Sequence, residues 1–294
     1  MGLFPRTVVS WPANLPQGPT SNVFFVDYNN GSDNNPGTKR EQPLESIAAA
    51  IALCDDAQSD TIFVTSQVHV EDQPIVVDVQ AVRIIGLPVN QPHAQQARTW
   101  IFPDAHVTGG VFTISAGDVT IENFMLWGTA GQPCIDFGVG ATDVRNVIKN
   151  CSFHLGSYGV MTGPAANQPS HYLSIVDCMF GPGLDTGGIL HASNGSWPLI
   201  ADCFFETIPG PNISVTGGIA GGRIERCLFM LDSDTEGEAI TMGAGPTRWW
   251  IVDNVANDNT TAAITANPFL EQGDDNAWCG NSKGGGARTG IAPA

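Results

Sequence analysis

The segment VTIENFML at residues 119–126 is the first copy of a phrase that recurs through the second half of the chain and decides the fold. The later copies are NVIKNCSF (146–153), LSIVDCMF (173–180), LIADCFF (199–205), RIERCLF (223–229) and WIVDNVA (250–256). Their shared isoleucines are Ile121, Ile148, Ile175, Ile200, Ile224 and Ile251, at intervals of 27, 27, 25, 24 and 27 residues. Six copies in near register predict a solenoid, because such units bury their apolar faces only by stacking on one another.

Two further columns run through the aligned phrases. Three residues after each isoleucine stand Phe124, Cys151, Cys178, Cys203, Cys227 and Asn254. Two residues further on stand Leu126, Phe153, Phe180, Phe205, Phe229 and Ala256. Stacked coils place equivalent residues about 4.8 Å apart, the spacing of neighbouring strands. We therefore expect an internal cysteine ladder between an aliphatic column and a phenylalanine column.

A second strand is predicted between the phrases, at CIDFG (134–138), GVMTG (159–163), GILHA (188–192), EAITMG (238–243) and AAITA (262–266). Upstream, residues 61–70, 81–89, 99–104 and 110–117 have the apolar character of buried strands. These patterns predict an all-β fold, a right-handed parallel β-helix with about 24–27 residues per coil.

The ends of the chain differ from the repeats. Residues 43–54 have apolar side chains at helical spacing and predict a short N-terminal capping helix. Residues 1–22 contain four prolines and are expected to form an extended arm. The β-helix domain is predicted over 23–266, and 267–294 as a C-terminal cover and tail that shields the last coil.

Composition excludes some classes of partner. The net charge is −17 with only 12 Lys and Arg, whereas nucleic-acid binding needs a basic patch. No apolar run is long enough for a membrane span, and the N-terminus lacks the pattern of a secretory signal. The seven cysteines occur singly, which favours reduced, buried thiols over disulfides or zinc.

The segment FFVDYNNGSDNNPGTKREQPLESIAAAI (24–51), together with the repeats, resembles the pectate-lyase-like parallel β-helix superfamily. That superfamily includes polysaccharide lyases, glycoside hydrolases, and tail spikes and other structural proteins of phage virions. In overall character the chain is most similar to the virion proteins. The resemblance implies a non-enzymatic structural protein of a tailed bacteriophage particle, either a capsid decoration or a spike component. It further implies a homotrimer, other virion proteins such as the major capsid protein as partners, and location in the virion after assembly in the host cytoplasm.

The alternative is a polysaccharide-degrading enzyme, a lyase or a glycoside hydrolase. A lyase of this superfamily would use an acidic calcium cluster with a basic residue, but Arg145, Lys149, Arg223 and Arg226 match no such motif. Arg226 aligns with Asn150, Asp177 and Asp202 and is expected to point outward.

Glycoside hydrolysis needs two carboxyl groups about 5–10 Å apart. Asp177 and Asp202 fall in one column on neighbouring coils and are the candidate pair, although such a column also suits a solvated face. Gly273-Asp274-Asp275 resembles one piece of a polygalacturonase signature without its partners.

Three other groups of residues contain side chains of the types found in binding sites. The carboxylates of Asp232, Asp234, Glu236 and Glu238 alternate as in a calcium loop, but without the full EF-hand pattern. The histidines His154, His171 and His191 form no metal or catalytic set. Trp197, Trp249 and Trp250 would stack on sugar rings if exposed, which makes a carbohydrate-binding tail-spike module a third hypothesis and a glycan a candidate partner. No residue is assigned a catalytic, cofactor-binding or metal-binding role, and no cofactor is expected.

Overall fold

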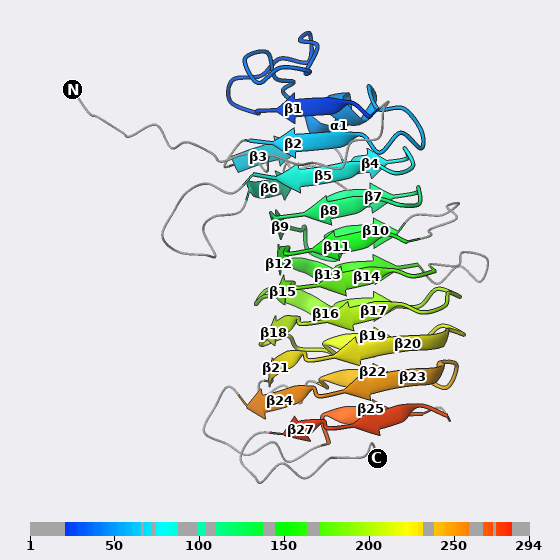
Figure 1. Cartoon of the computed structure of the whole chain (residues 1–294). Coiled ribbons are helices and arrows are strands. Elements are labelled where there is room, and N and C mark those ends of the chain that lie inside the picture. The colour runs from blue at the N-terminus through cyan, green and yellow to red at the C-terminus, as the bar shows by residue number, and fades with distance from the viewer. Residues whose placement is uncertain are drawn as a thin grey trace.

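The computed structural model describes residues 21–65, 68–71, 74–87, 99–103, 110–137, 145–163, 171–231, 238–258, 267–272 and 275–283. Over these residues the chain is a right-handed parallel β-helix, with its strands stacked along one axis (Figure 1). This confirms the predicted fold class.

Three parallel sheets form the faces of the solenoid. The ten-stranded sheet contains β1 (Val23–Val26), β2 (Thr61–Val64), β5 (Arg83–Gly86), β8 (Thr120–Glu122), β11 (Val147–Lys149), β14 (Ser174–Val176), β17 (Leu199–Ala201), β20 (Ala220–Glu225), β23 (Thr247–Val252) and β26 (Ala277–Cys279). The nine-stranded sheet contains β3 (Val68–Glu71), β6 (Thr99–Pro103), β9 (Phe124–Trp127), β12 (Ser152–His154), β15 (Met179–Phe180), β18 (Phe204–Glu206), β21 (Leu228–Leu231), β24 (Val255–Asp258) and β27 (Ser282–Lys283). The eight-stranded sheet contains β4 (Ile75–Val77), β7 (Phe112–Ile114), β10 (Ile135–Phe137), β13 (Gly156–Thr162), β16 (Leu184–His191), β19 (Ile213–Val215), β22 (Ile240–Met242) and β25 (Phe269–Glu271).

Each coil therefore has three strands, and the repeated phrase is two strands instead of one. In the first copy, β8 ends at Glu122 and β9 begins at Phe124 in a different sheet. Asn123 between them has φ of 67°, a left-handed conformation that turns the chain sharply from one sheet into the next. The sequence pattern runs unbroken through this corner because both strands have buried positions.

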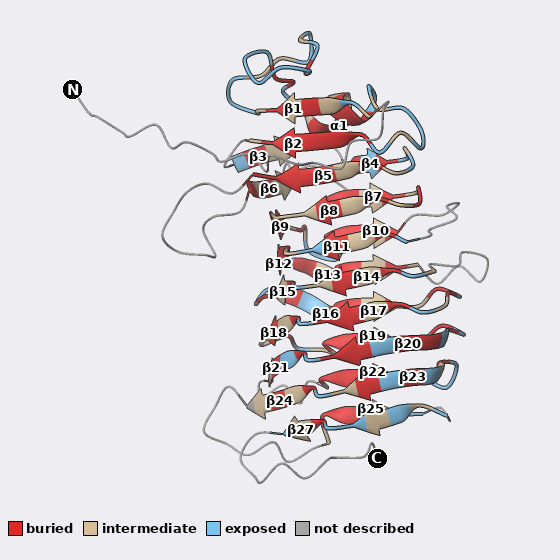
Figure 2. Cartoon of the chain, viewed as in Figure 1, coloured by how far each residue is buried: buried red, intermediate tan, exposed pale blue. Residues whose placement is uncertain are grey.

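The three predicted columns are confirmed. The strand register pairs each isoleucine of the phrase with the next, from Ile121 through Ile251. The rings of Phe153, Phe180, Phe205 and Phe229 stack in sequence, with centroids 4.7, 4.6 and 4.8 Å apart. Cys151, Cys178, Cys203 and Cys227 are all buried, and none of the four forms a disulfide. Figure 2 shows buried residues, in red, on strands of successive coils along the solenoid.

The cysteine column ends in asparagines. Asn254 donates to the carbonyl of Ile224 at 3.1 Å and accepts from the backbone N–H of Cys227 at 3.0 Å. Asn281 occupies the equivalent place one coil later and donates to the carbonyl of Ile251 at 2.8 Å. The ladder thus continues with side chains that bond the backbone of the preceding coil, so that buried polar groups are paired.

The predicted capping helix over 43–54 is not supported. Among the described residues, the only α-helix is α1 (Ile47–Ile51), which is five residues long.

 The helix starts late because Leu44 is held in a bridge to β1, where its N–H donates to the carbonyl of Phe25 at 2.8 Å. Ser46 then caps the helix by accepting from the N–H of Ala49 at 3.0 Å. The buried residues of α1 are Ile47, Ala50 and Ile51, whereas Ala48 is exposed.

The solenoid continues beyond residue 266, where the sequence predicts an irregular cover. Strands β25, β26 and β27 pair with β22, β23 and β24 and extend all three sheets. Phe269 is buried and its ring lies 6.0 Å from that of Trp278. The predicted strand 262–266, residues 1–20 of the predicted arm and residues 284–294 of the tail lie outside the described residues. Among the described residues, no helix has the length and apolar character needed to cross a membrane.

Candidate functional site

The candidate catalytic column forms the corner between the ten-stranded and nine-stranded sheets. In each coil from β8 to β26, one residue occupies this corner in a left-handed conformation, with φ between 49° and 69°: Asn123, Asn150, Asp177, Asp202, Arg226, Asp253 and Gly280. Asn, Asp and Gly tolerate this conformation better than other residues. The turn therefore accounts for most of the residue types in this column, including both candidate carboxylates.

The carboxylate of Asp202 forms an ion pair with Arg226 of the next coil. Arg226 Nε donates to Asp202 Oδ1 at 2.8 Å, and Arg226 Nη2 donates to Asp202 Oδ2 at 2.7 Å. These bonds from Arg226 lower the pKa of Asp202 below its usual value. Arg226 also pairs with Glu225, and its side chain is half exposed, as the sequence predicted. Asp177 is exposed on the neighbouring coil.

The other basic candidates are spread over the outer surface. Arg145 makes a two-pronged pair with Asp118, with Nε–Oδ1 and Nη2–Oδ2 distances of 2.6 and 2.8 Å. Hydrogen bonding from Arg145 lowers the pKa of Asp118. Lys149 is exposed on β11, in register with Glu122 of β8. The Arg145–Asp118 pair joins successive coils.

The acidic candidates near the C-terminal end are only partly described. Asp232, Asp234 and Glu236 lie outside the described residues, as do Gly273 and Asp274. Glu238 accepts a hydrogen bond from the hydroxyl of Thr241, and Asp275 occupies a left-handed position before β26. Within the ranges that the structure describes, no group of three or more His, Cys, Asp or Glu side chains is arranged to hold a metal ion.

The three histidines lie in three different environments. His154 bonds Ser152 Oγ through Nε2 at 2.9 Å and stacks on Trp127. His171 lies beside Tyr172 at a coil corner. His191 is buried, with Nδ1 2.9 Å from the hydroxyl of Thr162, and burial lowers its pKa to about 4. The structure does not bring these side chains together.

Asp136 is a carboxyl group that sequence reasoning missed. It lies between the buried Ile135 and Phe137 of β10 and so faces outward, and partial burial raises its pKa. Its register neighbours on the adjacent strands are Thr113 and Met161. Neither supplies the second carboxyl group that glycoside hydrolysis needs.

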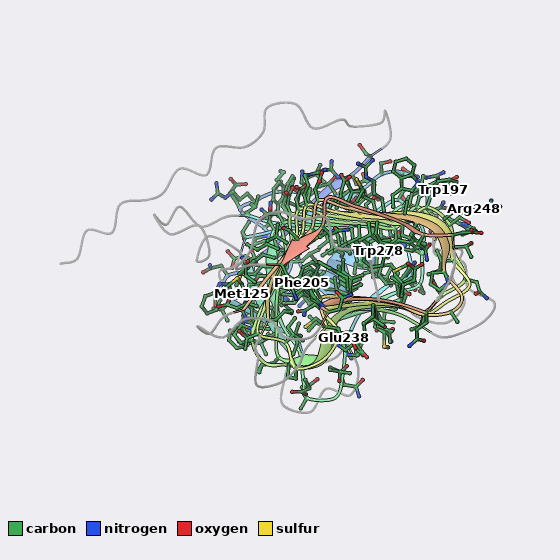
Figure 3. The ribbon with its side chains drawn as sticks, turned by 90° about the horizontal axis from the view of Figure 1, so that it is seen from below. Met125, Trp197, Phe205, Glu238, Arg248 and Trp278 are labelled. Atoms are coloured by element: carbon green, nitrogen blue, oxygen red, sulfur yellow. The ribbon has the colours of Figure 1, made fainter. Side chains whose placement is uncertain are left out.

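A groove of about 350 Å³ lies on the outer face of the ten-stranded sheet, between β17 and β23. Its lining residues are Trp197, Pro198, Leu199, Gly222, Arg223 and Trp250. Trp197 and Trp250 are each 60% exposed, whereas Trp249, the third tryptophan considered from the sequence, is fully buried. Seen along the solenoid axis, Trp197 lies at the same corner of the cross-section as Arg248, across the core from Phe205 (Figure 3).

Two glycines shape this groove. A Cβ atom on Gly222 would lie 2.7 Å from the ring of Trp249, so the absence of a side chain there lets the Trp249 indole fill the core. Gly221 has φ of 72°, and a Cβ atom there would meet three ring carbons of Trp197 at 3.1, 3.1 and 3.3 Å. These nearly equal distances show that the Trp197 ring lies flat over Gly221. One indole face is therefore covered by backbone.

The sequence contained part of the signal for the groove. Leu199, Arg223 and Trp250 are register partners on β17, β20 and β23, and this register follows from the aligned isoleucines one residue later. The place of Trp197 depends on the corner that precedes β17, whose conformation the repeat pattern did not reveal. Consequently, sequence reasoning treated Arg223 as an isolated base and did not associate it with the two tryptophans.

Comparison with known proteins supports the fold. No protein-family model matches the chain, and no curated protein matches it by sequence. The solved structure of pectate lyase Pel9A is similar over 90% of this chain and 78% of its own, at 12% identity and a TM-score of 0.55. The structure of sacteLam55A from Streptomyces sp. SirexAA-E is similar over 76% of this chain, at 12% identity and a TM-score of 0.55. The alignment covers only 44% of sacteLam55A.

A phage protein also matches. ORF18 of Geobacillus virus E2 is 12% identical over 82% of this chain and 58% of its own, with a TM-score of 0.45, too low to carry an argument. At these identities the likenesses show the pectate-lyase-like β-helix fold alone, and this fold is compatible with both an enzymatic and a structural role.

Proposed function

We propose that this chain is a non-enzymatic structural protein of a tailed bacteriophage particle, a capsid decoration or spike component that assembles as a homotrimer in the virion. The observation that supports this proposal most is the continuity of the internal ladders. Stacked isoleucines, cysteines and phenylalanines run from coil to coil, and buried asparagines extend the cysteine column. Such a core makes a stiff rod, because each coil is fixed by its neighbours.

The outer corners support the same proposal. The Asp118–Arg145 and Asp202–Arg226 pairs each join residues of successive coils, 27 and 24 positions apart in sequence. A hydrolase would need the carboxylate of Asp202 as its acid or nucleophile. Here that carboxylate binds Arg226 and so links two coils of the rod. The resemblance of the sequence to virion β-helix proteins adds the expectation of a trimer whose partners include other virion proteins, such as the major capsid protein.

Attachment to the particle is proposed for residues 1–22, on the basis of their proline-rich sequence. The test is incorporation of the full chain and of a chain lacking 1–22 into phage particles, followed by light scattering of both proteins in free form. We expect a trimeric mass for both chains and loss of incorporation for the shortened one. Unchanged incorporation would count against the anchoring segment, and a monomeric mass for the full chain would count against the trimer.

The alternative, a polysaccharide lyase or hydrolase, makes a different prediction. It requires release of sugar fragments and loss of that release when Asp177 or Asp202 is changed to Asn. The proposed function requires that no fragments are released.

A further inference from the structure

The groove between Trp197 and Trp250 has the composition of a ligand site instead of a packing defect. Its volume of about 350 Å³ is at the small end of the range, about 300–1,000 Å³, in which small-molecule sites fall. Such sites have mainly apolar walls with a few placed polar groups. Here the walls are two indoles, a proline and a leucine, and Arg223 is the charged lining residue.

The two indoles are presented at different levels of the solenoid. Trp250 lies on β23, two strands from β17, and Trp197 lies at the corner that leads into β17. The Trp197 ring reaches over Gly221 of β20, which is one strand spacing, about 4.8 Å, from β23 along the axis. The flat packing of Trp197 over Gly221 limits its freedom of rotation, so little conformational entropy is lost when a ligand stacks on its open face.

Arg223 supplies polar recognition between the two rings. Its side chain is 52% exposed, and it pairs with the carboxylate of Glu225 on the same strand. Glu225 therefore balances the charge of the guanidinium and limits its orientations, while the remaining N–H groups of a guanidinium are hydrogen-bond donors. With a net charge of −17, the protein repels extended polyanions. A neutral ligand with many hydroxyl groups fits this environment best.

We propose that this groove binds a neutral oligosaccharide, with pyranose rings stacked on Trp197 and Trp250 and ring hydroxyls bonded by Arg223. A pyranose ring combines an apolar C–H face with equatorial hydroxyl groups, and this matches indole faces with a donor between them. The inference goes beyond the proposed structural function and does not depend on it. Binding without release of fragments is compatible with a virion protein that contacts a glycan-bearing surface.

Self-association is the competing use of an exposed aromatic groove. A stable protein interface buries about 800 Å² on each partner, around an apolar centre. The groove is narrower than such a surface, and its rim includes the half-exposed, charged side chain of Arg223. The observations therefore favour a saccharide, and the experiment separates the two uses.

The test is titration of the full-length protein with a panel of neutral gluco-, manno- and galacto-oligosaccharides, followed by calorimetry and tryptophan fluorescence. We expect saturable binding of at least one member at up to millimolar concentration. Trp197→Ala and Trp250→Ala should each weaken binding by roughly tenfold or more, equivalent to about 1.4 kcal/mol, and Trp250→Phe should retain most of it. Because the ligand is neutral, the affinity should change little between low and high salt.

Tyr172→Ala is the matched control. Tyr172 is 53% exposed and has the same left-handed corner conformation one coil before Trp197, but it does not line the groove. This variant should bind as the unmodified protein does, and circular dichroism of every variant should show the same β-sheet content.

Three results would overturn the inference: no saturable binding of any panel member, binding unchanged in the Trp197→Ala/Trp250→Ala double variant, or loss of binding in Tyr172→Ala alone. A lower oligomeric mass of the double variant, with no effect on saccharide binding, would assign the groove to self-association. Release of sugar fragments that persists in the double variant would instead overturn the proposed structural function. The inference about the groove would then still be decided by the binding titrations of the Trp197 and Trp250 variants.

Discussion

Arg226 and Asp202 occupy equivalent corners of neighbouring coils, and their side chains are joined by two parallel hydrogen bonds of 2.8 and 2.7 Å. Both residues have left-handed backbones, with φ of 52° and 55°. This relationship explains why a column that looks catalytic in the sequence is structural in the folded chain. The corner needs residues that tolerate positive φ, and the exposed Asp that results is paired by the next coil.

The first prediction concerns this pair. Asp202→Asn preserves a side chain suited to the left-handed corner but removes the charge that Arg226 binds. We expect a small loss of stability that disappears at high salt, since exposed ion pairs are screened. Urea unfolding at low and high salt measures it, with Asp177→Asn as the control at the preceding corner. A large loss that persists at high salt would contradict this account of the corner.

The second prediction concerns the phenylalanine ladder. Phe205→Ala removes a fully buried ring that stacks on Phe180 and Phe229 at 4.6 and 4.8 Å, and should lower the free energy of unfolding by about 3–5 kcal/mol. Phe204→Ala is the matched control, because Phe204 is the adjacent residue of β18 on the outer face and is only partly buried. Similar losses for the two variants would contradict the assignment of Phe205 to the core and Phe204 to the outer face.

The third prediction uses the cysteines as probes of the core. The thiolate is the reactive form, and burial raises the pKa of Cys134 and that of Cys54 to about 12. The ladder thiols are buried, and burial also raises the pKa of Cys203. Native protein should therefore be alkylated rapidly at the exposed Cys279 alone, as read by mass spectrometry, and Cys279→Ser should abolish the rapid phase. Rapid labelling of Cys151, Cys178, Cys203 or Cys227 would contradict the conclusion that these thiols are buried in the core.

The fourth prediction concerns His191 and pH. Its pKa is about 4 in the folded chain because of burial, and about 6.5 when the chain is unfolded. The unfolded state thus binds the proton first, so stability is complete above about pH 6.5 and declines as the pH falls toward 4. The full decline due to this group is about 3 kcal/mol, an order-of-magnitude figure from that pKa difference.

His191→Gln tests this prediction against the acid titration of the many carboxylates. The variant keeps a polar group near the Thr162 hydroxyl but cannot ionise. Urea unfolding between pH 7 and 4 should show a flatter pH dependence for the variant than for the unmodified chain. Parallel curves would mean that His191 is accessible to protons in the folded state.

The sequence predicted the fold because the core of a solenoid repeats a local pattern. The isoleucine at Ile148 recurs in all six phrases, the cysteine at Cys151 and the phenylalanine at Phe153 recur in four, and each position fills the same place on successive coils. The extent of the helix could not be predicted from its apolar spacing, since Leu44 is recruited into a bridge with Val26. Such non-local pairing leaves no periodic signal.

The candidate site was less predictable for a related reason. The column that contains Asp177 and Asp202 is visible in the sequence, but the pairing of Asp202 depends on the side-chain geometry of Arg226 one coil away. The groove depends on Gly221, because the absence of a side chain there lets the Trp197 ring lie over the backbone. It also depends on the corner conformation of Trp197, which is set by backbone hydrogen bonding between coils. Sequence reasoning located the tryptophans but not the surface they share.

The most direct test of the proposed non-enzymatic role is incubation of the purified chain with a panel of bacterial polysaccharides, with assay of new reducing ends and new unsaturated ends. The account predicts that neither appears above the level of a heat-denatured control, even where saccharide binding is detected. Release of fragments that is lost in Asp177→Asn or Asp202→Asn would contradict it and would identify the corner column as a catalytic pair.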